Sequence, residues 1–256
     1  MNGKRLSYVA VSVLCVLGLA GAASGQVEPP CIVAVAAGPG IELDQLHTTL
    51  IEMGLLYVDV GSVAAAQAAN ATVIIDRYGA SNLNNSDVTT WLNSGKGYIQ
   101  LGDWPEYFAN AFTNITEGAP ITLTVTDPSS PLATGLPASW TGHGFWAYDT
   151  SGSDYIGWAT NTALPDVVEA TYNSTTYTRV VSSELVGSGR AVYIGFNVYG
   201  SLAGANERTL FSNALSWAGV CSVAPVEPIP ALGWLGLAVF MAAIAVLGIA
   251  LASRLN

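Results

Sequence analysis

The sequence predicts an α/β fold: helices cover both faces of a parallel β-sheet, a β-rich insertion occupies the second half, and one transmembrane helix lies at the C-terminus. Three observations predict it. In the first half, short apolar segments alternate with segments whose apolar residues recur at the spacing of one helix face. In the second half, segments of strand composition are separated by Gly, Asn and Ser. Near the C-terminus, Ala231 to Ala252 carries no charge.

The first half predicts strands and helices in strict alternation. Leu43, Leu46, Leu50 and Met53, for example, give the first helix one apolar face. The predicted strands cover residues 32–37, 56–60, 71–75 and 97–101, and the predicted helices cover residues 42–53, 63–69, 86–92 and 103–112. Buried parallel strands with intervening helices form a sheet whose ligands bind at the carboxyl ends of the strands.

The second half predicts the β-rich insertion and then a return to the α/β sheet. The insertion's predicted strands are residues 121–126, 145–148, 155–159, 167–172 and 177–182. The segment from Ala191 to Phe196 is wholly apolar, like the strands of the first half, and a helix is predicted over residues 206–218. A last strand and helix of this kind would complete the parallel sheet.

The N-terminus predicts a signal peptide over residues 1–25. Lys4 and Arg5 precede an apolar run from Tyr8 to Ala20, and small residues fill positions 21–25. This order of basic, apolar and small residues is that of a secretory signal, and the run is short for a membrane span. Cleavage after residue 22, 23 or 25 stays open. Residues 26–223 are then an extracytoplasmic domain.

The C-terminus predicts a proline-rich linker over residues 224–230 and a membrane anchor over residues 231–256. Pro225, Pro228 and Pro230 stiffen the linker. The uncharged run that follows is long enough to cross a hydrocarbon core of ~30 Å. Arg254 keeps the C-terminus in the cytoplasm before any processing. The alternative, a buried core helix, is disfavoured because the run has no polar face.

The tail resembles the bacterial IPTL-CTERM sorting signal and, in layout, the wider PEP-CTERM class. The likeness rests on Ile229, Pro230 and Trp234 before the hydrophobic helix and on Arg254 after it. It implies an exosortase-type membrane enzyme as a processing partner. The chain departs from the family at Ala231, where Thr is usual, in its early Trp and in its reduced basic cluster.

Charge and cysteine usage restrict the function classes. Between Glu28 and Glu227 there are 18 acidic residues against five basic ones, a net charge near −13. This charge disfavours nucleic acid and anionic lipid headgroups as partners. Cys31 and Cys221 bracket the domain and predict a disulfide in an oxidising compartment, the alternative being two buried thiols. No metal site or cofactor is predicted.

The domain resembles the class I glutamine amidotransferase-like superfamily, which implies a flavodoxin-like sheet. Three segments, in this order, carry the likeness: Tyr98-Ile99-Gln100-Leu101-Gly102-Asp103, the Pro131-Leu132-Ala133-Thr134-Gly135-Leu136-Pro137 stretch, and residues 187–196 with 213–217. The family's catalytic Cys is absent, because Asp103 stands at the elbow position. Its His-x-Glu pair is also absent, because Asn197 and Val198 follow the last strand.

Polar and aromatic residues near the predicted strand ends give candidate site residues. If the chain is an enzyme, Asp103, Glu106 and His143 are its candidate acid–base residues. The candidate ligand-binding residues are Asp76, Arg77, Trp104 and Trp146. The alternative is that Asp103 caps a helix and that His143 is a turn residue. The aromatic rings near these loops could form a sugar-binding cleft, and the alternative for them is packing in the core.

Two functions follow from these observations. The first is a membrane-anchored surface protein whose domain has a non-catalytic binding or structural role, with a glycan or a surface protein as the ligand. The second is a surface hydrolase acting on a glycan or a related polar substrate.

Overall fold

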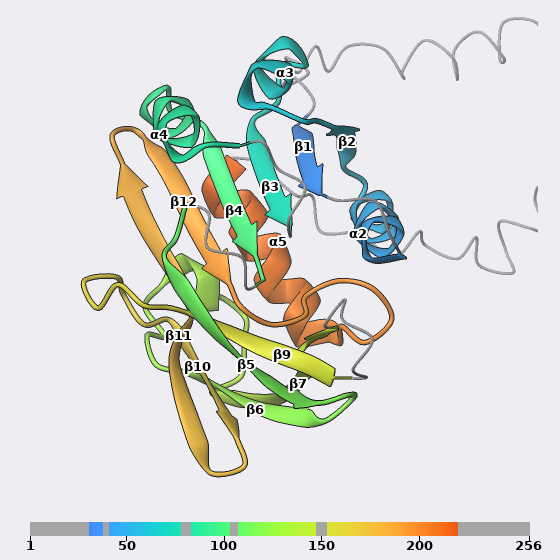
Figure 1. Cartoon of the computed structure of the whole chain (residues 1–256), viewed down its shortest axis with the longest axis vertical. Helices are drawn as coiled ribbons and strands as arrows, with labels where there is room; N and C mark the ends of the chain where they lie inside the picture. Colours follow the sequence, from blue (N-terminus) through green and yellow to red (C-terminus); the bar gives the residue numbers. More distant parts are fainter. Residues whose placement is uncertain (1–30, 38–40, 78–82, 103–106, 147–152, 220–256) are drawn as a thin grey trace, which may run out of the picture. The chain divides into compact units, whose positions relative to one another are not determined.

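The computed structural model describes residues 31–37, 41–77, 83–102, 107–146 and 153–219 (Figure 1). The elements are β1 (Ile32–Ala37), α2 (Ile41–Glu52), β2 (Leu56–Asp59), α3 (Val63–Ala68), β3 (Val73–Arg77), α4 (Asn85–Asn93), β4 (Gly97–Leu101), β5 (Asn110–Thr116), β6 (Pro120–Val125), the 3-10 turn η1 (Pro131–Ala133), β7 (Ser139–His143), β8 (Phe145–Trp146), β9 (Ser153–Ala159), β10 (Val168–Tyr172), β11 (Thr175–Val186), β12 (Gly189–Ile194) and α5 (Ala205–Gly219).

A nine-stranded sheet in the order β2-β1-β3-β4-β12-β11-β10-β6-β7 forms the centre of the fold. The first five strands in this order are parallel, and the remaining pairs are antiparallel. The parallel part therefore has the strand order of a doubly wound sheet. The predicted alternation of strand and helix is confirmed for residues 32–101, and the return to the sheet is confirmed by β12 and α5.

Helices lie on both faces of the parallel strands, as predicted. Leu46 of α2 and Phe211 of α5 belong to one hydrophobic cluster, whereas Val63 of α3 and Trp91 of α4 belong to the other. Because helices cover both faces of the sheet, every residue of β3 and β4 is buried. This double burial explains why these strands are continuous apolar segments and show no alternation.

The β-rich part contributes to two sheets. Strands β11, β10, β6 and β7 extend the central sheet beyond β12, while β5, β9 and β8 form a separate three-stranded sheet. The long strand β11 pairs with β12 over Val181–Val186 and thereby joins the insertion to the parallel strands. The insertion is thus continuous with the predicted sheet.

The prediction of a helix over residues 103–112 is wrong for residues 107–112, the part that the structure describes. Residues 107–109 are not helical, and β5 begins at Asn110. The aromatic residues of this stretch imitate a helical spacing, but Phe108 is fixed by a bond from its N–H to the side chain of Gln100 at 2.8 Å. From Asn110 onward the backbone pairs with β9. Tertiary pairing thus overrides the local pattern.

Strand β7 was not predicted, because its sequence Ser-Trp-Thr-Gly-His has little strand character. It forms because Trp140 packs into the core and pairs with Leu123 of β6. Gly142 is needed here, since a Cβ would lie 2.5 Å from the Leu123 side chain and 2.8 Å from that of Glu207.

The signal peptide, the linker, Cys221, the membrane helix and the sorting motif all lie outside the described residues, so these predictions are not tested. Within the described ranges, no helix is long and apolar enough to cross a membrane.

Candidate functional site

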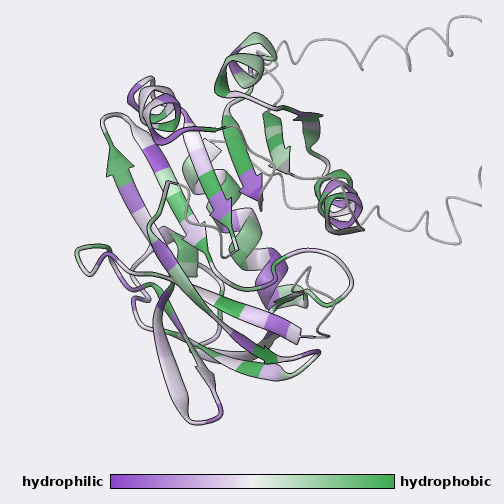
Figure 2. Cartoon of the chain, in the orientation of Figure 1, coloured by the Kyte–Doolittle hydropathy of each residue, from purple (hydrophilic) through white to green (hydrophobic). Residues whose placement is uncertain are grey.

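The carboxyl ends of β3 and β4 carry polar residues in an otherwise apolar sheet, and Figure 2 shows these strand ends in the hydrophilic colour. Asp76 and Arg77, both predicted as ligand-binding residues, end β3 and are buried. As neighbours in a strand they point to opposite faces of the sheet. They therefore contribute to two different polar clusters.

Asp76 lies on the face covered by α3 and α4. Its carboxylate accepts a hydrogen bond of 2.6 Å from the buried hydroxyl of Tyr98. Tyr98 packs edge-on against Tyr107, with ring centroids 5.6 Å apart. Burial, and after it the nearby carboxylate of Glu184, raise the pKa of Tyr107 to about 12. The phenol therefore keeps its proton to a higher pH than an ordinary tyrosine does.

Arg77 lies on the opposite face and connects β3 to the second sheet. Its Nε donates to the hydroxyl of Tyr199 at 2.8 Å. The guanidinium carbon lies 4.5 Å from the ring centroid of Phe145 and 5.9 Å from that of Tyr155. Both distances are in the range of cation–π attraction, which is stronger when water is excluded. The charge of Arg77 is thus held within aromatic surroundings.

Strand β9 crosses directly over the carboxyl ends of β4 and β12, and glycines make this approach possible. The N–H of Gly157 donates to the carbonyl of Gly195 at 2.7 Å, and a Cβ on Gly195 would overlap that part of β9. Gly102, which follows β4, has a φ of +98°. A Cβ there would lie 2.6 Å from the Tyr155 hydroxyl and 2.9 Å from Arg77 Nη1. The backbone just before the elbow position is therefore tightly packed.

His143 is brought close to a carboxylate that the sequence interpretation did not include. It ends β7, and its carbonyl accepts the N–H of Asn197 at 3.1 Å, beside the segment after β12. Its Nδ1 is buried without a hydrogen-bond partner among the described residues. The pKa of Asp154 is raised by burial and, to a lesser extent, by Glu117; the Gly118 N–H and the charge of His143 oppose this rise. His143 and Asp154 therefore interact electrostatically.

The structure does not test the remaining predicted site residues. Asp103, Trp104 and Glu106 lie outside the described residues, so the proposed acid–base site with His143 is not tested. Trp146 ends β8, but its side chain is not described. The predicted disulfide is also untested, because Cys221, the predicted partner of Cys31, lies outside the described residues. Cys31 Sγ lies 3.3 Å from the Thr72 hydroxyl.

The interpretation of the aromatic residues as core holds for four of the described rings, whereas Tyr107 and Trp158 are half-buried. Phe108, Trp140, Phe145 and Tyr155 are all buried. The sequence interpretation did not include Tyr98, Tyr193 and Tyr199 among the candidate site residues. Tyr98 lies in β4, Tyr193 in β12 and Tyr199 in the loop after β12. Within the described part of the chain, no group of three or more His, Cys, Asp and Glu residues could hold a metal ion.

Comparison with known proteins shows likeness of fold only. No family profile and no curated protein matches the sequence. A ThuA-like protein from Bacteroides uniformis matches with a TM-score of 0.54 and 13% identity over 77% of this chain and 95% of its own. One from Parabacteroides merdae matches with a TM-score of 0.56 and 14% identity over 78% and 94%. A cold-adapted β-galactosidase from Rahnella sp. R3 matches with a TM-score of 0.50 and 11% identity over 74% of this chain and 31% of its own.

The ThuA-like proteins have the class I glutamine amidotransferase-like fold, so the described domain is similar to proteins of that class. The parallel strand order, the helices on both faces and the polar carboxyl edge agree with this likeness. At these identities the comparison extends to the fold alone.

Proposed function

We propose that this protein is a membrane-anchored bacterial surface protein whose amidotransferase-like domain has a non-catalytic binding or structural role. The observation that carries the non-catalytic part of the proposal is the packing around Gly102. Tyr155 and Arg77 occupy the space beside it, where a Cβ would meet both side chains. A nucleophile elbow needs free space for a substrate atom ~3 Å from the nucleophile.

The chemistry of the residues supports the same conclusion. The family's nucleophilic Cys is replaced by Asp103, and Asn197 and Val198 stand where its His-x-Glu pair would follow the last strand. Asn197 has instead a structural role, because its backbone N–H binds the carbonyl of His143 and its side chain accepts the N–H of Tyr199 at 3.1 Å.

The proposed location rests on the two ends of the sequence. The basic, apolar and small-residue order of residues 1–25 supports export, and the uncharged run after Pro230 supports anchoring with the domain outside. The IPTL-CTERM-like tail supports processing by an exosortase-type enzyme.

Fractionation of a secretion-competent bacterial host tests the location. We expect the full chain in the membrane fraction, with the domain cleaved by a protease added outside the cells. A variant that ends after Pro230 should be released in soluble form. Full-length protein in the cytoplasm with an intact N-terminus would contradict the proposal.

Turnover assays test the non-catalytic role. We expect no hydrolysis of glutamine or of nitrophenyl glycosides above the buffer rate by the purified full chain. Reproducible turnover of either substrate class would overturn this part of the proposal without affecting the membrane location.

The second candidate function, a surface hydrolase acting on a glycan, is favoured by one observation. His143 lies beside the segment after β12, where the related family has its catalytic His, and a buried carboxylate, Asp154, is near it. Asp103 and Glu106 would then complete the acid–base set. If this function holds, glycoside turnover should disappear in both Asp103→Asn and His143→Ala, whereas turnover that survives the double substitution excludes this site.

A further inference from the structure

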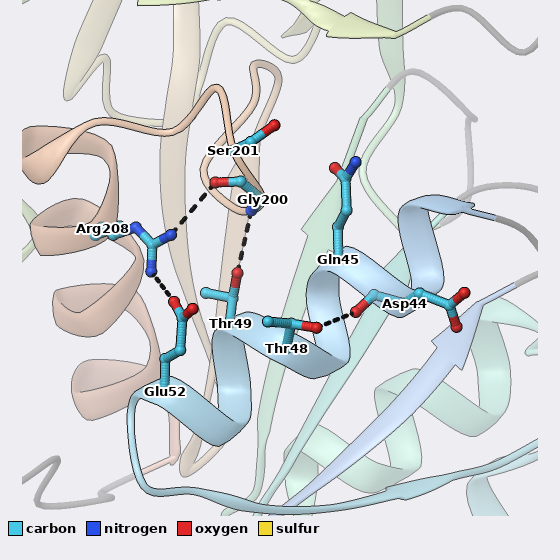
Figure 3. Close-up of a pocket in the computed structure, with 8 residues that line it drawn as sticks. All are labelled: Asp44, Gln45, Thr48, Thr49, Glu52, Gly200, Ser201 and Arg208. Atoms are coloured by element: carbon cyan, nitrogen blue, oxygen red, sulfur yellow. Dashed lines mark hydrogen bonds and ion pairs between the residues drawn. The ribbon is translucent and has the colours of Figure 1, made fainter.

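A pocket of about 340 Å³, lined by polar residues and one glycine, lies between α2, the loop after β12 and α5 (Figure 3). Gln45, Thr48 and Thr49 line it from α2, Gly200 and Ser201 from the loop, and Arg208 from α5. Its volume is at the lower end of the ~300–1,000 Å³ that is usual for small-molecule sites.

The walls of the pocket are fixed to one another by hydrogen bonds. Arg208 Nη1 forms an ion pair with Glu52 on α2, and its Nη2 donates to the carbonyl of Gly200 at 3.3 Å. The N–H of Gly200 donates in turn to the buried hydroxyl of Thr49 at 3.1 Å. The three elements are thus cross-linked before any ligand binds, which lowers the entropy cost of binding.

Gly200 allows the loop to approach α2 closely. It has a φ of +76°, a conformation that favours glycine, and a Cβ at this position would overlap the amide oxygen of Gln45. Figure 3 shows Gln45 on α2 and Ser201 on the loop among the residues that line the pocket. A side chain larger than hydrogen at position 200 would therefore displace the Gln45 amide.

The charge of the pocket does not favour an anion. The guanidinium of Arg208 is already neutralised by Glu52, and Asp44 adds a further carboxylate to the lining. A free phosphate, a sulfate or a carboxylate ligand would therefore meet a net negative site. The pocket therefore differs from an ordinary phosphate or carboxylate site, which needs an Arg or Lys with free donors.

The polar groups left for a ligand are neutral and can both donate and accept hydrogen bonds. The Gln45 amide and the Ser201 hydroxyl have no hydrogen-bond partner among the described residues. The Thr48 hydroxyl donates to the carbonyl of Asp44 at 2.8 Å and keeps its acceptor capacity. Groups that both donate and accept match ligand hydroxyls, which do the same.

We propose that this pocket binds a neutral polyhydroxylated ligand of the size of a mono- or disaccharide. Gln45 and Ser201 provide the direct hydrogen bonds, and Thr48 accepts one more. The Arg208–Glu52 ion pair fixes α5 to α2. The inference rests on the proposed binding role of the domain, and it gives that role a site and a ligand class.

Ligand-observed NMR with the detergent-solubilised full chain tests the proposal. The neutral probes are glucose, galactose, N-acetylglucosamine, maltose and lactose, and the charged probes are glucose 6-phosphate and galacturonate. We expect saturation transfer to at least one neutral probe and none to the anionic probes. In Gln45→Leu, which keeps the side-chain size but removes the amide, the affinity should fall about tenfold.

Two glycine variants control for backbone strain. Gly200→Ala should abolish binding, because its Cβ displaces the Gln45 amide. Gly118→Ala places an alanine at a φ of +67° with nothing within 4 Å of its Cβ, so it should bind like the wild-type chain. If Gly200→Ala does not fold, Ser201→Ala replaces it, with an expected loss of several-fold.

Several outcomes would overturn the proposal: no binding of any neutral probe, tighter binding of an anionic probe, or unchanged affinity in both Gln45→Leu and Ser201→Ala. None of these outcomes affects the membrane location or the turnover assays, so a failure here is distinguishable from a failure of the proposed function.

Discussion

At the residue scale, the buried charges of this domain are each held by a specific partner. Glu207, in the first turn of α5, accepts a hydrogen bond of 3.0 Å from the indole N–H of Trp140. Arg77 combines a hydrogen bond to Tyr199 with the face of the Phe145 ring. Because a charge taken out of water is costly unless it is compensated, these contacts decide whether the strand ends can be buried.

Arg77→Met tests the energetic role of the buried guanidinium. The substitution keeps side-chain length but removes the donor to Tyr199 and the cation–π contact. We expect the free energy of unfolding to fall by about 2–4 kcal/mol, measured by urea denaturation. Arg208→Met is the matched control. It removes a half-exposed ion pair and a long hydrogen bond to the Gly200 carbonyl, each contributing about 1 kcal/mol or less. Equal losses in the two variants would contradict this role.

Asp154→Asn should change how stability depends on pH. Burial raises the folded-state pKa of Asp154 above its ordinary value of 3.8, so the folded state binds more protons than the unfolded chain between these two values. In the wild-type chain this group therefore lowers the free energy of unfolding as pH rises through that window, and the loss is complete above the folded-state pKa. Asn keeps an oxygen to accept the N–H of Gly118, which Asp154 accepts at 2.9 Å.

The variant should gain stability relative to the wild type as pH rises from below 3.8 to neutral. Denaturation of both proteins at a series of pH values measures this difference. A stability difference that does not depend on pH would show that Asp154 does not titrate differently in the folded state.

At the element scale, the crossing of β9 over the parallel sheet determines how tightly the carboxyl edge of the sheet is packed. The carbonyl of Gly195 accepts the N–H of Gly157, and the N–H of Gly195 donates to the carbonyl of Val180 at 2.8 Å. Gly195 therefore joins β9 and β11 just after β12. Such a close approach of backbones leaves no room for a side chain. It also places Tyr155 of β9 beside Gly102.

Gly195→Ala should therefore be strongly destabilising. Its Cβ would overlap the backbone of Gly157, and backbone cannot move aside as a flexible side chain can. We expect a loss of about 1–3 kcal/mol or more and faster hydrogen exchange at the Gly157 amide. Gly61→Ala is the matched control, since a Cβ there meets nothing within 4 Å. Its stability should stay within about 0.5 kcal/mol of the wild type.

At the scale of the whole molecule, the predicted disulfide would close a loop around nearly the entire domain. The chain-entropy estimate for so long a loop is about 4–5 kcal/mol. We expect the mature protein to contain no free thiol by mass spectrometry after alkylation, and its Tm to fall on reduction. The Cys31→Ser, Cys221→Ser double variant should have a lower Tm than the wild type without reductant, and its own Tm should not change on reduction. Two free thiols in the exported, oxidised protein would contradict the pairing.

The sequence by itself determined the parallel half of the fold. Strands such as Val73–Arg77 are buried on both faces, so their composition is continuously apolar and readable without any partner. The helices between them showed their apolar faces for the same reason. Asp76 and Arg77 were recognised as candidates because polar residues at the end of such a strand interrupt that composition.

Only the tertiary structure decided the β-rich part and the environment of the site. The start of β5 was predicted as a helix and β7 was not predicted, because pairing with β9 and β6 stabilises these strands more than their own composition does. Arg77 and Tyr199 are 122 residues apart in the chain, and no local pattern signals their contact. The tight packing at Gly102 and the pocket between α2 and α5 likewise arise from segments that meet only when the sheet is complete.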